Sequence, residues 1–489
     1  MTVYLVGAGP GDPGLLTVRG AELLARAEVI VYDRLTASEL LDLAPADCRM
    51  VHVGKQPGGP SVAQDEINAM LVRFGGDGRC VVRLKGGDPY VFARGAEEAA
   101  ALEAAGVDYE VVPGISSAFA APSAAGIPVT MRYSSTHVTV VTGHEDPTKG
   151  RTDVNWEAIA AAGGTIVVLM GVGRWQAISE RLIAGGLDPD TPAAAVQWGS
   201  TSRQHTVRAT LATLGQQRLG TPSVIVVGSV AAERLDWFER RPLFGRRVVI
   251  TRAREQASKL ADRLRSLGAE VVLAPTIEIT GPSDGGESLR AAAVALGASK
   301  PAWVVFSSAN AVDRFFARLT DARDLAGSRV AAIGPGTLEA LERCGIRADL
   351  VPDRYVAEGL LEVFPAAAAD GGRVLLPRAE VARDILVEGL VAKGWTVEVV
   401  PTYRTVPAPV DESLGEEVRS ADAICFASSS SVTNFVAAYG ASTPAVVAAI
   451  GPVTAARAAE LGLEVSVVPQ RSTIPDMVDA LEEHFGNPR

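Results

Sequence analysis

The stretch RVVITRAREQASKLADRLRSLGAEVVLAP (residues 247–275) indicates the fold class of this chain. RVVITR (247–252) is a continuous β-branched run, EQASKLADRLRSLG (255–268) is typical of an amphipathic helix that ends at glycine, and AEVVLAP (269–275) is a second strand. The same alternation begins the chain over residues 3–33. Buried strands that alternate with helices predict an α/β protein with mainly parallel sheets, covered by helices on both faces.

This stretch also recurs later in the chain. RVVITRAREQASKLADRLRSLGAEVVLAPTIEI (247–279) is similar to RVLLPRAEVARDILVEGLVAKGWTVEVVPTYRT (373–405). Two more blocks recur in the same order: WVVFSSANAVDRFF (303–316) with AICFASSSSVTNFV (423–436), and AAIGPGTLEALERCGI (331–346) with AAIGPVTAARAAELGL (448–463). An ordered internal repeat predicts two similar α/β lobes that face each other across a cleft.

The repeat has no counterpart before residue 240, and WFERRPLFGRR (237–247) separates the two styles of sequence. We expect the domains to span residues 1–240 and 245–489. A prior of roughly 150 residues per domain suggests about three compact units in 489 residues.

Composition narrows the function classes. The chain is 47% apolar and 21% charged with a net charge of −11, which argues against a nucleic-acid partner. No apolar run reaches 18 residues and the start lacks a basic leader, so neither a membrane span nor a signal peptide is expected. Four scattered cysteines without a CxxC predict no metal site and no disulfide scaffold, and favour the cytoplasm.

VYLVGAGPGDPG (3–14) is similar to a dinucleotide-binding loop but departs from it. Asp12 stands where the GxGxxG pattern requires its third glycine, and Pro10 and Pro13 interrupt any immediate helix. We therefore favour a tight strand-exit turn that lets a ligand approach the backbone, over a helix that binds phosphate.

VVRLKGGDPYVFARGAEE (81–98) contains a second glycine loop. The strand ends in Gly86-Gly87-Asp88-Pro89, where small residues leave backbone groups open and Asp88 can accept hydrogen bonds. An ordinary β-turn is the competing interpretation.

Ten short motifs identify a family for the first half. GAGPGDP, VYDRL, VGK, Q-x-EIN, RLKGGDP, RGAEE, VPGISSA, AGIP, TGH and LMG occur in the order seen in the tetrapyrrole methylases. Residues 1–240 resemble the S-adenosylmethionine-dependent uroporphyrinogen-III C-methyltransferases, which implies a two-lobed methylase fold. The resemblance implies that S-adenosylmethionine contacts Pro10, Gly86, Gly87, Asp88, Val91, Ser116, Ser117, Met170 and Gly199, and leaves as S-adenosylhomocysteine.

The same resemblance implies the catalytic groups. Asp33 and Lys55 match a proton acceptor and a proton donor, and Arg94 and Glu97 match a second catalytic pair; surface salt bridges are the alternative for all four. Methyl transfer to a pyrrole carbon must be followed by loss of a proton, which needs a base and no metal. The substrate carries eight carboxylates, so arginines such as Arg83, Arg94 and Arg132 could bind it.

Residues 245–489 resemble the uroporphyrinogen-III synthases through VVITRA, VVFSSANAV, IGPGT, VLLPR, VEVVPTYRT, CFASSSSV and IGPVT. The resemblance implies two flavodoxin-like parallel-sheet lobes, one formed by 245–278 with 405–489 and the other by 279–404.

Polar residues at the strand ends of this half are the predicted substrate contacts. Serines there are helix N-caps first, but exposed amides and hydroxyls at helix starts also bind carboxylates. The predicted contacts are Arg252, Ser307, Ser308, Thr337, Arg378, Ser429 and Thr454. Tyr403 could assist the departure of hydroxide from hydroxymethylbilane; the alternative is an aromatic ring packed against a lobe.

Together the resemblances imply a bifunctional enzyme of cobalamin or siroheme synthesis. One half would cyclise hydroxymethylbilane to uroporphyrinogen III with inversion of ring D, and the other would methylate C2 and C7 to give precorrin-2. A homodimer through the methylase half is expected. The alternative is a methylase for a later precorrin, with the second half as a ligand-sensing module.

Overall fold

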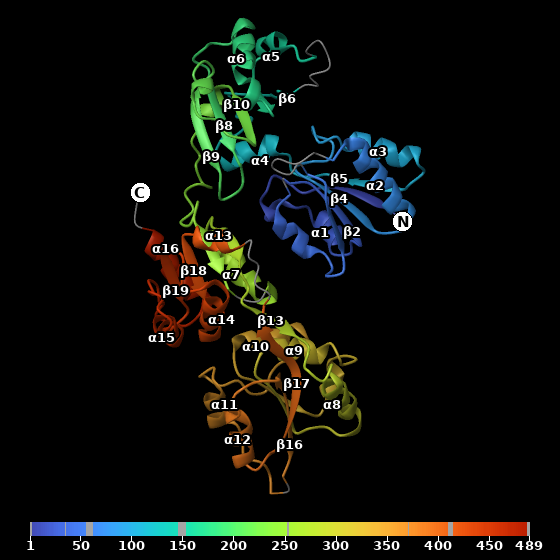
Figure 1. Cartoon of the computed structure of the whole chain (residues 1–489), viewed down its shortest axis with the longest axis vertical. Coiled ribbons are helices and arrows are strands. Elements are labelled where there is room, and N and C mark those ends of the chain that lie inside the picture. The colour runs from blue at the N-terminus through green and yellow to red at the C-terminus, as the bar shows by residue number, and fades with distance from the viewer. Residues whose placement is uncertain are drawn as a thin grey trace. The chain divides into compact units, whose positions relative to one another are not determined.

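A computed structural model describes residues 2–34, 36–54, 62–144, 153–251, 254–369, 371–408 and 414–486, with the backbone alone over 254–258 (Figure 1). The chain forms two compact units: Met1–Val248 with Asp262–Val271 and Leu481–Arg489, and Val249–Ala261 with Val272–Ala480. Across the described residues, no helix is both long and apolar enough to span a membrane.

The first sheet has the strand order β3-β2-β4-β1-β5, and all its pairings are parallel. Its strands are β1 (Val3–Gly7), β2 (Val29–Tyr32), β3 (Arg49–His52), β4 (Val81–Lys85) and β5 (Tyr109–Val112). The helices of this region are α1 (Val18–Leu24), α2 (Gln64–Gly76), α3 (Gly95–Ala104) and α4 (Ser117–Ala124). Separate hydrophobic clusters cover its two faces, one with α2 and α3 and the other with α1, as expected for a buried parallel sheet.

The second sheet, of order β6-β7-β10-β8-β9, differs from the expected parallel arrangement. It contains β6 (Val138–Thr142), β7 (Thr165–Leu169), β8 (Pro192–Gln197), β9 (His205–Thr210) and β10 (Ser223–Val227), with helices α5 (Trp156–Ala162) and α6 (Trp175–Ala184). Only β6 and β7 pair in parallel; β10 is antiparallel to β7 and β8, and β8 is antiparallel to β9. A short connection joins β8 to β9, which suits antiparallel neighbours, whereas α5 lies between the parallel strands β6 and β7.

Alanines of α4 attach this helix to the second sheet. Ala118, Ala121 and Ala125 pack with Val167 and Val196 in one core, while α5 and α6 cover the opposite face. Helix α4 therefore follows the last strand of the first sheet and covers a face of the second.

The third sheet has the order β12-β11-β18-β19. Its strands are β11 (Arg247–Ile250), β12 (Glu270–Leu273), β18 (Ala423–Phe426) and β19 (Val446–Ala449). Its helices are α7 (Arg254–Ser266), α13 (Leu414–Arg419), α14 (Ser429–Tyr439), α15 (Pro452–Glu460) and α16 (Ile474–Phe485).

The fourth sheet has the order β13-β17-β16-β14-β15, parallel except for β13. Its strands are β13 (Ile277–Thr280), β14 (Trp303–Phe306), β15 (Arg329–Ala332), β16 (Arg373–Ala379) and β17 (Thr396–Pro407). Its helices are α8 (Glu287–Ala298), α9 (Ala309–Phe316), α10 (Pro335–Arg343), α11 (Ala357–Val363) and α12 (Ile385–Ala392). The α/β class is confirmed, and both copies of the repeat form strand, helix and strand.

The two connections between the third and fourth sheets run together. β13 pairs with β17 from Ile277 opposite Pro407, and the Ala408 amide donates to the Thr276 carbonyl at 3.2 Å. The Thr276 hydroxyl donates to the carbonyl of Thr251, just beyond β11. The chain therefore passes out of and back into the third sheet as a paired ribbon.

Candidate functional site

Three glycines pack the strand-exit loops of the first sheet against one another. An added Cβ on Gly114 would lie 2.2 Å from the Gly87 carbonyl oxygen and 2.7 Å from the Gly7 Cα. Gly9 and Gly87 form a short antiparallel bridge, with the Gly87 amide donating to the Gly9 carbonyl at 2.7 Å. Because no side chain separates these loops, a ligand at this edge would meet backbone directly.

Asp88 fastens two of these loops together. Its Oδ2 accepts from the Gly114 amide at 3.0 Å and its Oδ1 accepts from the Tyr90 amide at 2.8 Å. The carboxylate already has two backbone partners, so its first role is to fix the loops after β4 and β5.

Residues in strained conformations line one edge of the second sheet. β7 and β8 are both antiparallel to β10, so their C-terminal ends lie at the same edge. Met170 follows β7 at φ 55°, and Trp198 and Ser200 follow β8 at φ 49° and 68°. Non-glycine residues with positive φ are uncommon, and such strain clusters at functional sites.

The two sheets' loops meet at close contacts. A Cβ on Gly199 would lie 2.3 Å from the Ala121 Cβ in α4, and a Cβ on Gly11 would lie 2.8 Å from the Thr201 Cγ2. The residues predicted to contact the cofactor therefore come from two adjoining sets of loops. The first set holds Pro10, Gly86, Gly87, Asp88, Val91, Ser116 and Ser117, and the second holds Met170 and Gly199.

Two predicted contacts have structural partners. The Ser116 hydroxyl caps α4 by accepting from the Ala118 amide at 3.3 Å. The Val91 amide donates to the Asp88 carbonyl at 3.3 Å, and Val91 itself is 37% exposed.

A chain of alternating charges runs inward from the same edge, and we name it the charge chain: Asp33, Arg83, Glu98 and Lys85. Arg83 donates through Nη2 to both oxygens of Asp33 at 3.0 and 3.1 Å, and through Nε to Glu98 Oε1 at 3.0 Å. The Lys85 ammonium donates to the same Glu98 oxygen at 2.8 Å. Asp33 is 31% exposed, whereas the other three are buried.

This geometry corrects the expectation for Arg83. Its guanidinium is 2% exposed and is occupied by two carboxylates, so it does not reach a substrate carboxylate from this position. It instead holds Asp33 at the end of β2, beside the loop that follows β4.

Arg94 and Glu97 form an exposed bidentate pair at the start of α3. Nε donates to Oε1 at 2.8 Å and Nη2 to Oε2 at 2.6 Å, and Arg94 adopts φ 61°. The hydrogen bond from Arg94 holds the pKa of Glu97 below its usual range, and the same bond raises the pKa of Arg94. The pair is ionised, which suits binding more than proton transfer.

Arg132 and Lys55 are the remaining predicted residues of this half. Arg132 is exposed and lies over the Tyr133 ring, 5.0 Å from its centroid. Lys55 lies outside the described residues.

In the fourth sheet, Tyr403 and Ser308 are in hydrogen-bond contact. The Tyr403 hydroxyl on β17 lies 3.1 Å from the Ser308 Oγ, and Ser308 caps α9 by accepting from the Ala311 amide at 3.2 Å. The Tyr403 side chain is buried and its ring belongs to the core of this sheet. The packing interpretation is confirmed for the ring, and the hydroxyl contacts Ser308 at a strand end; the catalytic role of Tyr403 stays a prediction.

The repeated polar positions occupy equivalent places in the third and fourth sheets. Thr337 and Thr454 are buried in the first turns of α10 and α15, each after a Gly-Pro pair. Ser307 is half-buried directly after β14, whereas Ser429 is half-buried at the start of α14, where its Oγ donates to the Val453 carbonyl at 3.4 Å.

The expectation for Arg378 also needs correction. Its Nη2 donates to Asp384 at 2.8 Å and its Nη1 to the Arg383 carbonyl at 3.2 Å, while the buried Nε has no partner. Arg378 is 9% exposed because it holds the turn between β16 and α12 rather than projecting from it. Arg252 lies outside the described residues.

Two family models divide the chain. "Tetrapyrrole (Corrin/Porphyrin) Methylases" matches residues 2–215 and "Uroporphyrinogen-III synthase HemD" matches residues 258–479. The porphyrin biosynthesis protein HemD of Ruminiclostridium josui is 36% identical over 99% of this chain and 98% of its own length. The chain belongs to the tetrapyrrole methylases and the uroporphyrinogen-III synthases, joined in one polypeptide.

Two further similar proteins are C-methyltransferases. The uroporphyrinogen-III C-methyltransferase of Bacillus subtilis (strain 168) is 39% identical over 72% of this chain and 73% of its own length. A crystal structure of the Thermus thermophilus uroporphyrin-III C-methyl transferase, complexed with S-adenyl homocysteine, is 39% identical, with a TM-score of 0.41. It covers 47% of this chain and 98% of its own. This fused protein therefore carries a C-methyltransferase domain and a synthase domain, as the resemblances predicted.

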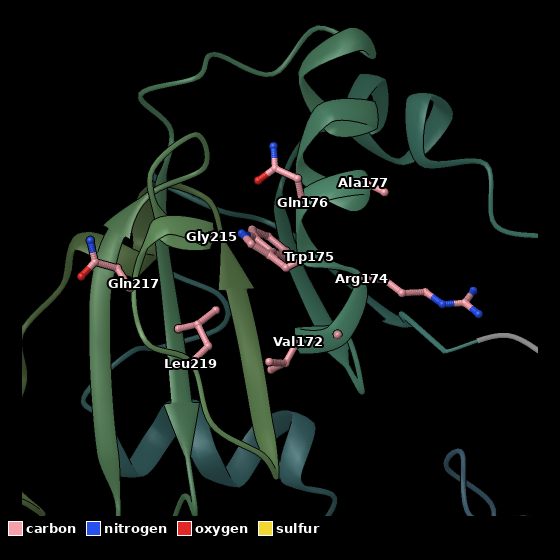
Figure 2. A pocket seen from close by; sticks show the side chains of 9 residues that line it. Val172, Arg174, Trp175, Gln176, Ala177, Gly215, Gln217 and Leu219 are labelled. Carbon is pink, nitrogen blue, oxygen red and sulfur yellow. The ribbon is translucent and has the colours of Figure 1, made fainter.

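The methylase half also has a pocket of about 520 Å³ between the start of α6 and residues 214–219 (Figure 2). Val172 and Leu219 line it, and Trp175 lies at its wall with the indole nitrogen directed toward Gly215. That nitrogen has no hydrogen-bond partner, but it is buried and therefore not accessible to a ligand in the pocket. The predicted site residues of the methylase lie elsewhere, at the strand-exit loops.

Lys85 and Glu98 are site residues that the sequence analysis missed. Both lie in the motif VVRLKGGDPYVFARGAEE, in which Arg83 and Lys85 interrupt an otherwise apolar strand. Cations two residues apart on a strand share a face, and a buried face needs carboxylate partners. That signal could have predicted a buried acid on the helix that follows.

The described ranges contain no group of three or more histidine, cysteine or acidic side chains that could hold a metal ion.

Burial raises the pKa of the Cys425 thiol to about 12, which keeps it protonated in the synthase core.

Proposed function

We propose that residues 245–489 cyclise hydroxymethylbilane to uroporphyrinogen III with inversion of ring D. Residues 1–240 then methylate C2 and C7 of this product with S-adenosylmethionine and give precorrin-2. The observation that carries the methylase proposal is the meeting of loops from the first and second sheets, where Gly11 approaches Thr201 and Gly199 approaches Ala121 in α4.

The loops fit the methyl donor chemically. Gly7 and Gly114 let the loops pack backbone against backbone, because a Cβ on either would clash with the neighbouring loop, and the bare amides and carbonyls at this edge can meet polar ligand atoms. Met170 is 49% exposed and supplies an adaptable apolar wall. When bound, S-adenosylmethionine would supply an electrophilic methyl group next to a positive sulfur.

Asp33 is the proposed proton acceptor after methyl transfer. Its carboxylate is partly exposed at the sheet edge and is oriented by two hydrogen bonds from Arg83. Arg94, with Arg132, would bind carboxylate arms of the substrate, since both guanidinium groups are exposed. Lys55 is retained as the proposed proton donor on family resemblance alone.

In the synthase half, the proposed chemistry uses few groups. The Tyr403 hydroxyl, in contact with Ser308, would protonate the departing hydroxide of hydroxymethylbilane. The proposed substrate contacts lie where strands lead into helices: Ser307 follows β14, and the first turns of α14, α10 and α15 hold Ser429, Thr337 and Thr454. The N-terminal ends of helices favour carboxylates. Holding the flexible chain in one conformation would supply most of the rate, as a proximity effect.

The remaining proposals concern organisation. The domains span 1–240 and 245–489, with one synthase lobe formed by 245–278 and 405–489 and the other by 279–404. The chain acts in the cytoplasm as a homodimer through its methylase half.

The test supplies the purified full chain with hydroxymethylbilane and S-adenosylmethionine and analyses the products by mass and isomer. We expect a type III macrocycle that has gained two methyl groups. Formation of the spontaneous type I isomer alone refutes the synthase proposal. Failure to methylate added uroporphyrinogen III, with methylation of a later precorrin, supports the alternative function: a methylase for a later precorrin whose second half is a ligand-sensing module.

A further inference from the structure

We propose that Glu98 is a positioning residue for methyl transfer, acting on Asp33 through Arg83. This inference rests on the proposed function, because it takes Asp33 as the proton acceptor. Neither family resemblance nor the sequence motifs assigned a role to Glu98.

Glu98 is the junction of the charge chain. Its Oε1 accepts from Arg83 Nε at 3.0 Å, from Lys85 Nζ at 2.8 Å and from Gln64 Nε2 at 3.3 Å. Its Oε2 is buried without a partner, and the side chain is 0% exposed. One oxygen therefore makes all the contacts of this acid, and two of the three are to cations.

Arg83 needs this contact to keep its orientation. Its remaining bonds inside the protein go from Nη1 to the Val31 and Leu84 carbonyls at 3.4 and 3.3 Å, which are long. The bond from Nε to Glu98 fixes one edge of the planar guanidinium, so that Nη2 meets both oxygens of Asp33. Loss of the Glu98 charge would free that edge and let Asp33 move.

Glu98 also matches the charge of Lys85. Burial lowers the pKa of Lys85, the nearby Arg83 charge lowers it further, and Glu98 raises it. The four side chains carry two positive and two negative charges, so removing the Glu98 charge leaves an excess of buried positive charge. Glu98 acts on Asp33 only through this balance and the guanidinium, since the structure shows no bond between the two carboxylates.

The test compares Glu98→Gln with Glu103→Gln, a matched control on the exposed side of α3. Measurements are kcat and KM for methylation, the Kd of S-adenosylhomocysteine by calorimetry, and synthase turnover of the same chain. We expect Glu98→Gln to lower the methylation kcat about tenfold or more, as a misplaced catalytic group does, with Kd and synthase turnover within twofold of the control. A kcat within twofold of Glu103→Gln overturns the inference.

A double-mutant cycle with Asp33→Asn separates positioning from a merely structural role. If Glu98 acts through Asp33, Glu98→Gln lowers kcat less than twofold once Asp33 is Asn. An equal loss in both backgrounds overturns the inference and leaves the proposed function standing. Wild-type methylation by Asp33→Asn refutes the proposed function instead, so the two failures are distinguishable.

Glu98→Gln could also weaken folding, because it leaves Lys85 buried without its carboxylate. The variant Glu98→Gln/Lys85→Met removes one charge of each sign and keeps the balance. If Glu98→Gln fails to bind S-adenosylhomocysteine, this paired variant decides: normal binding with a lowered kcat supports the inference, and normal binding with normal kcat overturns it.

Discussion

Replacing Gly114 by alanine tests the proposed cofactor cradle. The new Cβ would lie 2.2 Å from the Gly87 carbonyl oxygen and 2.7 Å from the Gly7 Cα, and all of the opposing atoms are backbone. Cβ contacts shorter than 3.0 Å essentially never occur, so the loops after β4 and β5 must separate by at least about 0.8 Å. Overpacking of this kind costs about 1–3 kcal/mol, and we expect the upper end because no flexible side chain can move aside.

The expected result is weaker binding of S-adenosylhomocysteine, by about 30- to 100-fold in calorimetry, since each 1.4 kcal/mol changes Kd tenfold. Synthase turnover of the same chain should be unchanged. Gly76→Ala is the matched control: a Cβ there meets nothing within 4 Å, and Gly76 ends α2 without a positive φ. Binding by Gly114→Ala within twofold of Gly76→Ala would show that the cofactor does not use this cradle.

Three further predictions use other parts of the chain. Tyr403→Phe keeps the packed ring and removes the hydroxyl that contacts Ser308, so type III product formation should fall about 100-fold or more, while methylation of added uroporphyrinogen III persists. Because Arg94 lowers the pKa of Glu97, the stabilisation from their ion pair should be fully present above the unfolded pKa near 4.5 and be lost as pH falls through the lower folded value. Carbon NMR of the Glu97 carboxyl measures this titration, and a midpoint above pH 5 would contradict the prediction. Cys425, with a pKa of about 12, should resist iodoacetamide at pH 8 in the native protein and react only after unfolding, as read by mass spectrometry.

Local patterns predicted the elements of this fold because their causes are local. The start of the run RVVITR forms the strand Arg247–Ile250, and the serines at 308 and 428 cap the helices that follow them. After β1 the chain forms a short 3-10 turn over Pro13–Leu15 and the α-helix begins only at Val18, which favours the strand-exit turn over a helix that binds phosphate. The antiparallel β10 was missed because periodicity indicates strands and not their direction.

Site residues were harder to predict where distant charges decide their roles. The sequence predicts Arg83 as a substrate contact, yet Asp33 and Glu98, 50 and 15 residues away in sequence, occupy its guanidinium. Arg378 is similar, because Asp384 folds back onto it through a turn. An arginine at a strand end can face solvent or a buried acid, and only the packed structure distinguishes the two.

The order of the third sheet has a consequence for synthesis of the chain on the ribosome. β11 lies between β12 and β18 in the sheet. The hydroxyl of Thr251, which follows β11, donates a hydrogen bond to the carbonyl of Cys425 in β18, 174 residues later in the chain. At about 5–20 residues per second, roughly 9–35 s pass before this neighbour is made. During that time the nascent β11 presents an unpaired edge, which is a template for aggregation. The third sheet can therefore be completed only after translation reaches β18, and we expect the edge of β11 to be a site of aggregation in incomplete chains.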